Sequence, residues 1–175
     1  KAVIPVHLYG NPARMDSIME LAHKYGLYVI EDATEALGST YKGKMVGTFG
    51  HIGVFSFNGN KIITTGSGGM LVTEDLELAR KARILAHQGR EPGEVEYEHR
   101  EIGFNYRLTN LQAALGLAQL ERLPEFLAAK RRNAMVYQQK LQSVNGISWQ
   151  KEVSGAESNW WLFSILINKD IYGKS

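Results

Sequence analysis

AVIPVHLYGNPARMDSIMELAHKYGLYVIED, residues 2–32, holds two apolar runs with a helical pattern between them. The first run, Ala2–Leu8, predicts a buried strand of the continuously apolar kind found in parallel sheets. Pro12 stands at an early position of the following helix, and Gly26 stands where helices commonly end. The second run, Leu27–Glu31, predicts another strand. Short connections in such a strand–helix–strand unit favour a parallel pair with a right-handed crossover, so we expect an α/β fold.

The sequence after residue 32 predicts more strands and helices, followed by a change of pattern. The expected strands are 40–44, Ile52–Phe57, Gly69–Thr73 and Asn159–Asn168. The expected helices start at Thr73 or Asp75, at a capping box of Thr109 and Gln112, and at about Glu125, the last of them running to Ser143. The polar run from Gln88 to Arg100 predicts a surface loop. We expect residues 1–123 to be part of a large domain, and residues 124–175 to be a linking helix with the start of a smaller, truncated domain.

The composition excludes several classes of function. A chain of 175 residues is long enough for a sizeable core, and a net charge of +2 with interspersed charges argues against nucleic-acid binding. The absence of cysteine excludes disulfides and thiolate metal sites, and we expect no metal. No apolar run is long enough to cross a membrane and no signal peptide is visible, so we expect a cytoplasmic protein without membrane contact. Both ends look cut, and we expect a piece of a longer protein.

Two residues beside apolar strands carry the groups that pyridoxal phosphate chemistry needs. Asp32 ends the strand 27–31, and ligands of open α/β sheets bind at the carboxyl ends of strands. Lys61 lies between apolar neighbours, just before the glycine-rich turn 64–69. A lysine amine can form a Schiff base with the cofactor aldehyde, and a carboxylate can keep the pyridine nitrogen protonated. A turn aspartate and a solvated surface lysine are the alternative interpretations, and the local sequence leaves them open.

Three further polar residues stand where they would suit an anion. Ser56 offers a hydroxyl to a phosphate oxygen, although a strand serine that faces solvent fits the sequence equally well. Asn105 and Arg107 precede the helix capped by Thr109, and helix N-termini attract anions. A turn asparagine with a surface arginine is the alternative there. The glycine-rich turn itself lacks the lysine of a P-loop and does not predict that kind of phosphate site.

Four segments carry further motifs: VHLYGNPARM (6–15), VIEDATEALGS (29–39), VFSFNGNKIITTGSGGML (54–71) and GFNYRLTNLQAALG (103–116). Together, and in this order, they resemble the DegT-type (StrS-like) sugar aminotransferase family, a branch of the fold-type I pyridoxal phosphate enzymes. The resemblance implies a three-layer large domain of the aspartate aminotransferase type, present here in part. It also implies the start of a small C-terminal α+β domain and a homodimer with shared active sites.

The resemblance assigns roles to individual residues. Lys61 would be the Schiff-base lysine and the proton shuttle, Asp32 would pair with the pyridine nitrogen, Glu35 would lie near the ring or its phenolic oxygen, and Ser56 would bind the cofactor phosphate. Asn105 would reach the phosphate of the partner subunit's cofactor, with Tyr106 and Arg107 near that shared site.

The activity implied by the resemblance is amination of a nucleotide-linked keto sugar, with glutamate as the amine donor, in the biosynthesis of lipopolysaccharide or another cell-surface glycan. The FNGNK motif and Ser67, where a carboxylate is common, look closest to enzymes that aminate UDP-linked 4-keto-6-deoxy amino sugars. Relatives that dehydrate sugars have histidine in place of Lys61. Two alternatives stay open: a non-catalytic regulatory or interaction paralogue, and an inactive fragment of the same fold.

Overall fold

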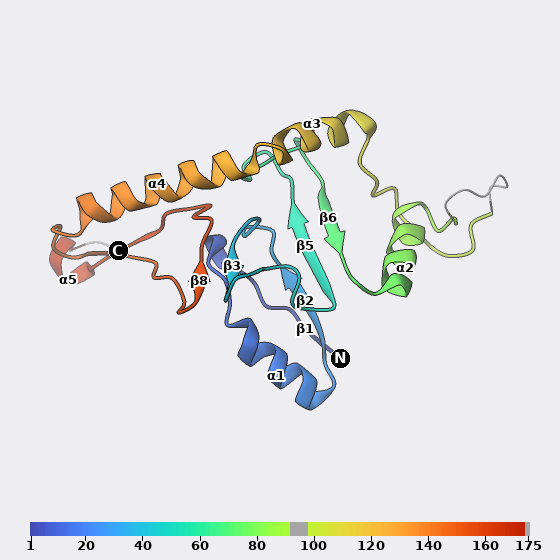
Figure 1. Ribbon diagram of the computed structural model, residues 1–175, viewed down its shortest axis with the longest axis horizontal. Helices are drawn as coiled ribbons and strands as arrows, with labels where there is room; N and C mark the ends of the chain where they lie inside the picture. Colours follow the sequence, from blue (N-terminus) through green and yellow to red (C-terminus); the bar gives the residue numbers. More distant parts are fainter. Residues whose placement is uncertain (92–97, 174–175) are drawn as a thin grey trace.

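The computed structural model describes residues 1–91 and 98–173 and has the α/β architecture expected from the sequence (Figure 1). Its main sheet has four strands in the order β1-β2-β5-β6. They are β1 (Ala2–Val3), β2 (Tyr28–Asp32), β5 (Ile52–Ser56) and β6 (Gly69–Val72). The first three strands are parallel and β6 is antiparallel to β5. The carboxyl ends of β2 and β5 therefore meet at one edge of the sheet.

The first strand is shorter than the sequence predicts. The run 2–8 is interrupted because Pro5 has no N–H to donate to a sheet ladder, and β1 ends at Val3. The chain rejoins the sheet at Val6, through a single parallel bridge to Asp32. It then turns into a short 3-10 helix, η1 (Leu8–Gly10). This early exit brings the segment after β1 alongside the end of β2.

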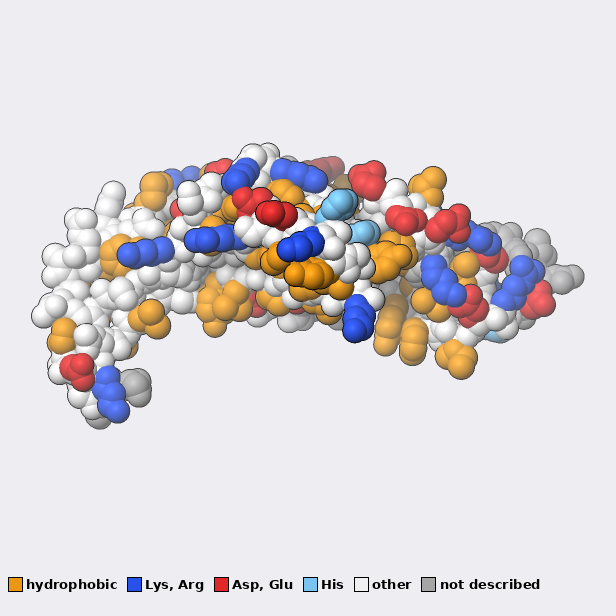
Figure 2. Space-filling model, turned by 90° about the horizontal axis from the view of Figure 1, so that it is seen from below, with side chains coloured by type: hydrophobic (Ala, Val, Ile, Leu, Met, Phe, Trp, Pro, Cys, Tyr) orange, Lys and Arg blue, Asp and Glu red, His pale blue; other side chains and the backbone are white. Residues whose placement is uncertain are grey.

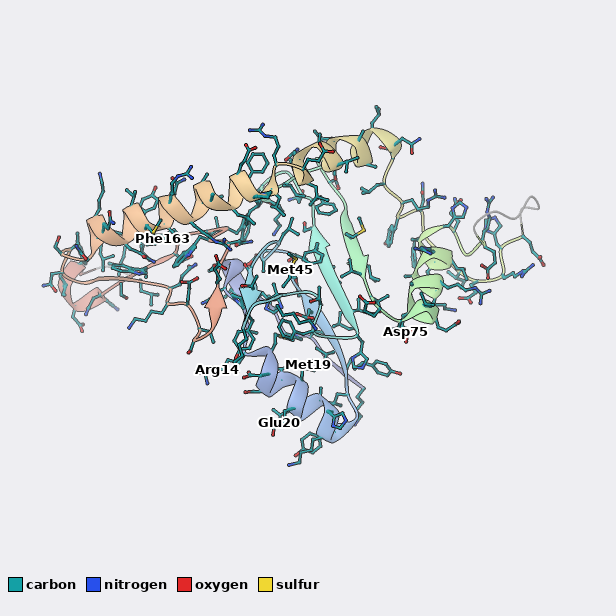
Figure 3. All side chains as sticks on the ribbon, in the orientation of Figure 1. Arg14, Met19, Glu20, Met45, Asp75 and Phe163 are labelled. Atoms are coloured by element: carbon teal, nitrogen blue, oxygen red, sulfur yellow. The ribbon has the colours of Figure 1, made fainter. Side chains whose placement is uncertain are left out.

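Helix α1 (Met15–Tyr25) covers one side of the sheet, and it starts a few residues later than Pro12 suggests. Its predicted end is confirmed, because Gly26 is left-handed (φ 60°) and donates its N–H to the carbonyls of the last turn. Met19 points toward the sheet and Glu20 points away from it (Figure 3). The core lies between this helix and the strands. Its buried members are Met15, Ala22, Val29, Ala33, Ala36, Tyr41, Val46 and Phe55.

Three helices follow the main sheet. They are α2 (Leu76–Ala86), α3 (Asn110–Leu120) and α4 (Leu123–Leu141). Asp75, not Thr73, caps α2, as its carboxylate accepts the N–H groups of Glu77 and Leu78 (Figure 3). The predicted capping box of α3 is confirmed. Part of the predicted 88–100 loop, residues 92–97, lies outside the described residues.

The C-terminal segment returns to the first part of the chain. Strand β8 (Ala156–Glu157) pairs with the hairpin of β3 (Thr40–Tyr41) and β4 (Lys44–Met45). A separate pair is formed by β7 (Ile147–Trp149) and β9 (Ile165–Ile167), with α5 (Lys169–Tyr172) after it. Phe163 stacks on Tyr137 of α4, with ring centroids 5.1 Å apart (Figure 3). The division into domains at residue 123 stays a prediction.

The strand predicted at 159–168 is only partly present. Its last residues form β9, whereas Asn159–Trp161 is irregular, with Trp160 at φ 51°. The reason is that Asn159 is fully buried and uses its side-chain amide to bond other parts of the main chain, so its segment does not join a ladder. None of the helices within the described ranges is long and apolar enough to cross a membrane.

Candidate active site

A small cavity at the carboxyl ends of β2 and β5 brings together Glu35, Ser56 and Lys61. Its volume is about 10 Å³. The rest of its lining comes from both ends of the chain: Thr34, Leu37, Ile62, Ile63, Asn159 and Trp161. Lys61 is half-buried, so the interpretation as a solvated surface lysine is not supported.

The Lys61 amine faces an aromatic ring and has no carboxylate partner within residues 1–91 and 98–173. Nζ lies 4.0 Å from the centroid of the Trp161 ring. The loop that carries Lys61 is fixed by α3, because Gln119 accepts the N–H of Thr64 (3.1 Å) and donates to its carbonyl (2.9 Å). A lysine that is held in place without an ion pair leaves its amine available for bonding to a ligand.

Asp32 is the last residue of β2, and its main-chain N–H and carbonyl both form hydrogen bonds with the segment that follows β1. Its N–H donates to the Pro5 carbonyl (2.9 Å), and its carbonyl accepts the N–H of His7 (3.1 Å). The carboxylate is half-buried, and Oδ1 accepts the N–H of Thr34 at 3.1 Å, as a turn aspartate does. No other hydrogen bond to this carboxylate occurs in the part of the chain that the structure describes. Oδ2 therefore has acceptor capacity left for a cationic ring N–H.

Glu35 and Ser56 are held by main-chain N–H groups. Glu35 Oε2 accepts the N–H of Tyr9 at 2.7 Å, and Ser56 Oγ accepts the N–H of Asn58 at 3.3 Å. Because Ser56 acts there as an acceptor, its hydroxyl hydrogen remains free to donate to an anion. The two residues thus supply an acidic and a donor group to the cavity of Lys61.

Sequence reasoning missed the contribution of the C-terminal segment. Asn159 Nδ2 donates to the carbonyls of Glu35 and Leu37, both at 3.0 Å, and Asn159 Oδ1 accepts the N–H of Trp161 at 2.9 Å. Trp161 Nε1 in turn donates to the carbonyl of Asn60 at 2.8 Å. The one available signal was a polar asparagine within an aromatic run, which periodicity assigned to a strand.

The structure does not bring Asn105, Tyr106 and Arg107 to this cavity. They line a separate groove of about 1080 Å³ between β6 and α2. Arg107 Nη1 donates to His87 Nδ1 at 3.0 Å. Partial burial, and then the positive charges of Arg107 and Arg90, hold the pKa of His87 below its ordinary value. The basic side chains that line the groove itself are Arg83 and Arg107.

The residues around Lys61 fit pyridoxal phosphate. An amine without an ion pair, a carboxylate with a vacant acceptor and a hydroxyl with a vacant donor are the groups that its aldehyde, ring nitrogen and phosphate require. The fold and this site thus define a fold-type I pyridoxal phosphate protein.

The chain belongs to the DegT/DnrJ/EryC1/StrS aminotransferase family, whose model matches residues 1–174, and this family depends on pyridoxal phosphate. It is 50% identical over 171 residues to EpsN from Bacillus subtilis (strain 168), covering 98% of this chain and 44% of that protein. It is 47% identical over 172 residues to the GDP-perosamine synthase of Caulobacter vibrioides, covering 98% of this chain and 46% of that enzyme.

Solved structures confirm the predicted fold class. The crystal structure of the aminotransferase TlmJ from Streptoalloteichus hindustanus superposes with a TM-score of 0.91 at 34% identity. The match covers 99% of this chain and 47% of TlmJ. The chain therefore spans about half the length of the relatives it matches. The predicted membership of the DegT-type family is confirmed, and the roles of individual site residues stay predictions.

Proposed function

We propose that the complete protein containing this chain is a pyridoxal phosphate-dependent aminotransferase. It converts a nucleotide-linked keto sugar to an amino sugar, with glutamate as the amine donor, for the biosynthesis of a cell-surface polysaccharide or related glycan. The observation that carries this proposal is the cavity that Lys61 lines together with Ser56, Glu35 and Thr34, the last of which donates its N–H to the Asp32 carboxylate. Similarity to GDP-perosamine synthases from three organisms supports a nucleotide-linked sugar as substrate.

Each residue has a chemical task in this proposal. Pyridoxal phosphate supplies an aldehyde that carries the amino group and a ring that withdraws electrons. Lys61 would hold the cofactor through its aldehyde, and its Nζ would then serve as the group that moves a proton to or from the sugar carbon. Asp32 accepts the N–H of the ring and keeps that nitrogen protonated. Ser56 Oγ donates to the phosphate, and Glu35 lies beside the ring.

The partner subunit is a second part of the proposal. Asn105, Tyr106 and Arg107 lie outside the cavity of Lys61, and Tyr106 is 76% exposed. Apolar side chains beside them are also exposed, among them Ile102 (89%) and Leu111 (85%). Exposed apolar surface of this kind marks an interaction site. We propose that this surface contacts a second copy of the protein and presents Asn105 to the cofactor phosphate of that copy.

The identity of the nucleotide is tested directly. The UDP-linked 4-keto-6-deoxy amino sugar predicted from the FNGNK motif stays a prediction, and the GDP-perosamine synthases support a GDP-linked substrate as the competing choice. The complete protein is incubated with glutamate and with either a UDP-linked or a GDP-linked 4-keto-6-deoxy sugar, and release of 2-oxoglutarate is measured. Only a sugar substrate allows release beyond the single equivalent per active site that glutamate alone produces. If neither sugar gives such repeated release, the proposed substrate class is contradicted. The cytoplasmic location expected from the sequence also stays a prediction.

The covalent role of Lys61 is tested by spectroscopy. The complete protein with pyridoxal phosphate should show an absorbance band near the visible edge that borohydride reduction fixes to the chain. Lys61→Ala should lose that band, whereas Lys140→Ala, which changes an exposed lysine of α4, should keep it. A band that survives in Lys61→Ala would overturn the assignment. Failure of the unaltered protein to bind pyridoxal phosphate would instead support the non-catalytic paralogue.

A further inference from the structure

His7 and Glu31 form a hydrogen-bonded pair inside the protein, and both side chains have an exposed fraction of 0%. Glu31 lies on β2, immediately before Asp32. Because side chains alternate along a strand, Glu31 and Asp32 point to opposite faces of the sheet. Glu31 therefore does not reach the cavity of Lys61, and the activity proposed above does not use it. A buried ionisable pair is costly to desolvate, so its presence calls for an explanation.

The hydrogen bonds around the pair define its protonation. His7 Nδ1 accepts the N–H of Ala13 at 3.0 Å, so the proton of the neutral ring is on Nε2. His7 Nε2 donates that proton to Glu31 Oε2 at 3.1 Å. Three main-chain N–H groups complete the set around the carboxylate: Gly47 (2.7 Å), Phe49 (2.5 Å) and Gly50 (2.6 Å). Burial raises the pKa of Glu31, but the bonds from His7, Gly50 and Gly47 outweigh it and hold the pKa below its ordinary value.

The pair connects the segments that carry the candidate cofactor groups. Through the main chain, His7 donates to the Asp32 carbonyl, and the nearby Pro5 carbonyl accepts the Asp32 N–H. Through its carboxylate, Glu31 holds the loop 47–50, which leads into β5 and so to Ser56. The segment after β1, the end of β2 and the start of β5 are thus tied to one carboxylate.

We infer that Glu31 and His7 are positioning residues that hold the Asp32 carboxylate where it would accept the ring N–H of pyridoxal phosphate. This inference rests on the proposed function. Glu31→Gln keeps the size of the side chain but replaces one oxygen by an NH₂ group. In either orientation of the amide, two of the four donors then face another donor. The end of β2 or the loop 47–50 must shift to relieve this contact, and Asp32 shifts with the end of β2.

A cofactor analogue separates positioning of Asp32 from general loosening of the fold. In 1-deazapyridoxal phosphate a C–H replaces the ring nitrogen, so the analogue has no N–H for Asp32. For the complete protein, Glu31→Gln should weaken the affinity for pyridoxal phosphate about tenfold and the affinity for the analogue less than about twofold. Tyr41→Phe, which removes a hydrogen bond to Asp16 in the same core, should change neither affinity.

Substitution of His7 provides a second, independent test of the inference if Glu31→Gln does not fold. His7→Phe removes the donor to Glu31 and should reproduce the selective loss, whereas His7→Gln places an amide N–H near the position of Nε2 and should restore most of the affinity. An equal loss for both cofactors would show a merely structural role and overturn the inference, as would no loss for either. If the unaltered protein binds no pyridoxal phosphate, the proposed function fails and the inference fails with it.

Discussion

The amine of Lys61 lies 4.0 Å from the centroid of the Trp161 ring. Trp161 belongs to the C-terminal segment, 100 residues further along the chain. Trp161 is held there by three of its own polar groups: its ring N–H donates to Asn60, its main-chain N–H donates to Asn159, and its carbonyl accepts from Lys130 of α4. The C-terminal segment therefore contributes Asn159 and Trp161 to the lining of the candidate site. Figure 1 shows this segment returning from α4 toward β3 and the carboxyl end of β2.

Truncation of Trp161 should destabilise the fold. The side chain is 8% exposed, so we expect Trp161→Ala to lower the free energy of unfolding by about 3–5 kcal/mol. Trp161→Phe keeps an aromatic face over Lys61 and loses the ring N–H bond, which corresponds to about 1 kcal/mol. Urea unfolding of both variants, with Trp149→Phe as a control outside the site, checks this order. A loss below about 1 kcal/mol in Trp161→Ala would show that the segment is not anchored by this ring.

A side chain at position 10 should disrupt the candidate site, because it would displace Asn159 from the lining of the cavity. Gly10 has φ +89°, and an added Cβ would lie 1.8 Å from Asn159 Oδ1. Its carbonyl also accepts the hydroxyls of Ser39 and Ser158. We expect Gly10→Ala to cost about 3 kcal/mol, because backbone strain adds to a forced displacement of Asn159.

Gly26→Ala is the matched control for Gly10. It has φ +60° with no atom within 4 Å of the added Cβ, so only the backbone strain of about 1 kcal/mol remains. Comparing the thermal unfolding of the two variants separates the cost of backbone strain from the cost of displacing Asn159. Equal shifts in Tm for the two variants would mean that contact with Asn159 contributes nothing.

The stability of the fold should fall at acid pH through Glu31. Its pKa in the folded state is lower than the ordinary value of 4.5. Above pH 4.5 the stabilising contribution of this carboxylate is complete, and it is lost as the pH falls from 4.5 through the folded-state pKa. The difference in unfolding free energy between the unaltered protein and Glu31→Gln should therefore shrink over that window. Glu20→Gln, on the outer face of α1, should show no such narrowing (Figure 3). A difference independent of pH would contradict this prediction.

Gln119 should matter for the loop that carries Lys61. Its amide exchanges two hydrogen bonds with the main chain of Thr64. Gln119→Ala removes both, and we expect a loss of about 1–2 kcal/mol together with faster hydrogen exchange at Thr64. Gln139→Ala, on the exposed surface of α4, should change neither quantity. Unchanged exchange at Thr64 in Gln119→Ala would mean that α3 does not restrain the loop.

Local patterns predicted the elements well where their own residues set the boundaries. The Gly26 stop of α1, the capping box of α3 and strands β2, β5 and β6 follow from side-chain chemistry within a few residues. The predictions differed from the structure where contacts between residues far apart in the sequence outweigh the local preference of the chain. Pro5 shortens β1. Asn159 bonds Glu35 and Leu37 rather than a neighbouring strand, and only Ile165–Ile167 of the strand predicted at 159–168 is present.

Surface placement was another property that periodicity did not reveal. Leu111, Leu115 and Ala118 form an apolar stripe at helical spacing on α3, yet no residue of this helix is buried, and Leu111 is 85% exposed. Seen from the side of α1, the molecule has a curved, elongated outline with hydrophobic side chains exposed between charged ones (Figure 2). An apolar stripe shows that a helix has a partner, but not whether that partner belongs to the same chain.

The sequence by itself determined the α/β class and the family, because strand ends, turn glycines and motifs are local properties of the chain. The roles that it predicts for Lys61 and Asp32 stay predictions. Only the tertiary structure showed that Trp161 and Asn159 close the site, that Asn105 faces a different groove, and that one buried carboxylate joins three segments. These depend on contacts between residues far apart in the sequence, and the geometry of such contacts is set by packing rather than by any pattern along the chain.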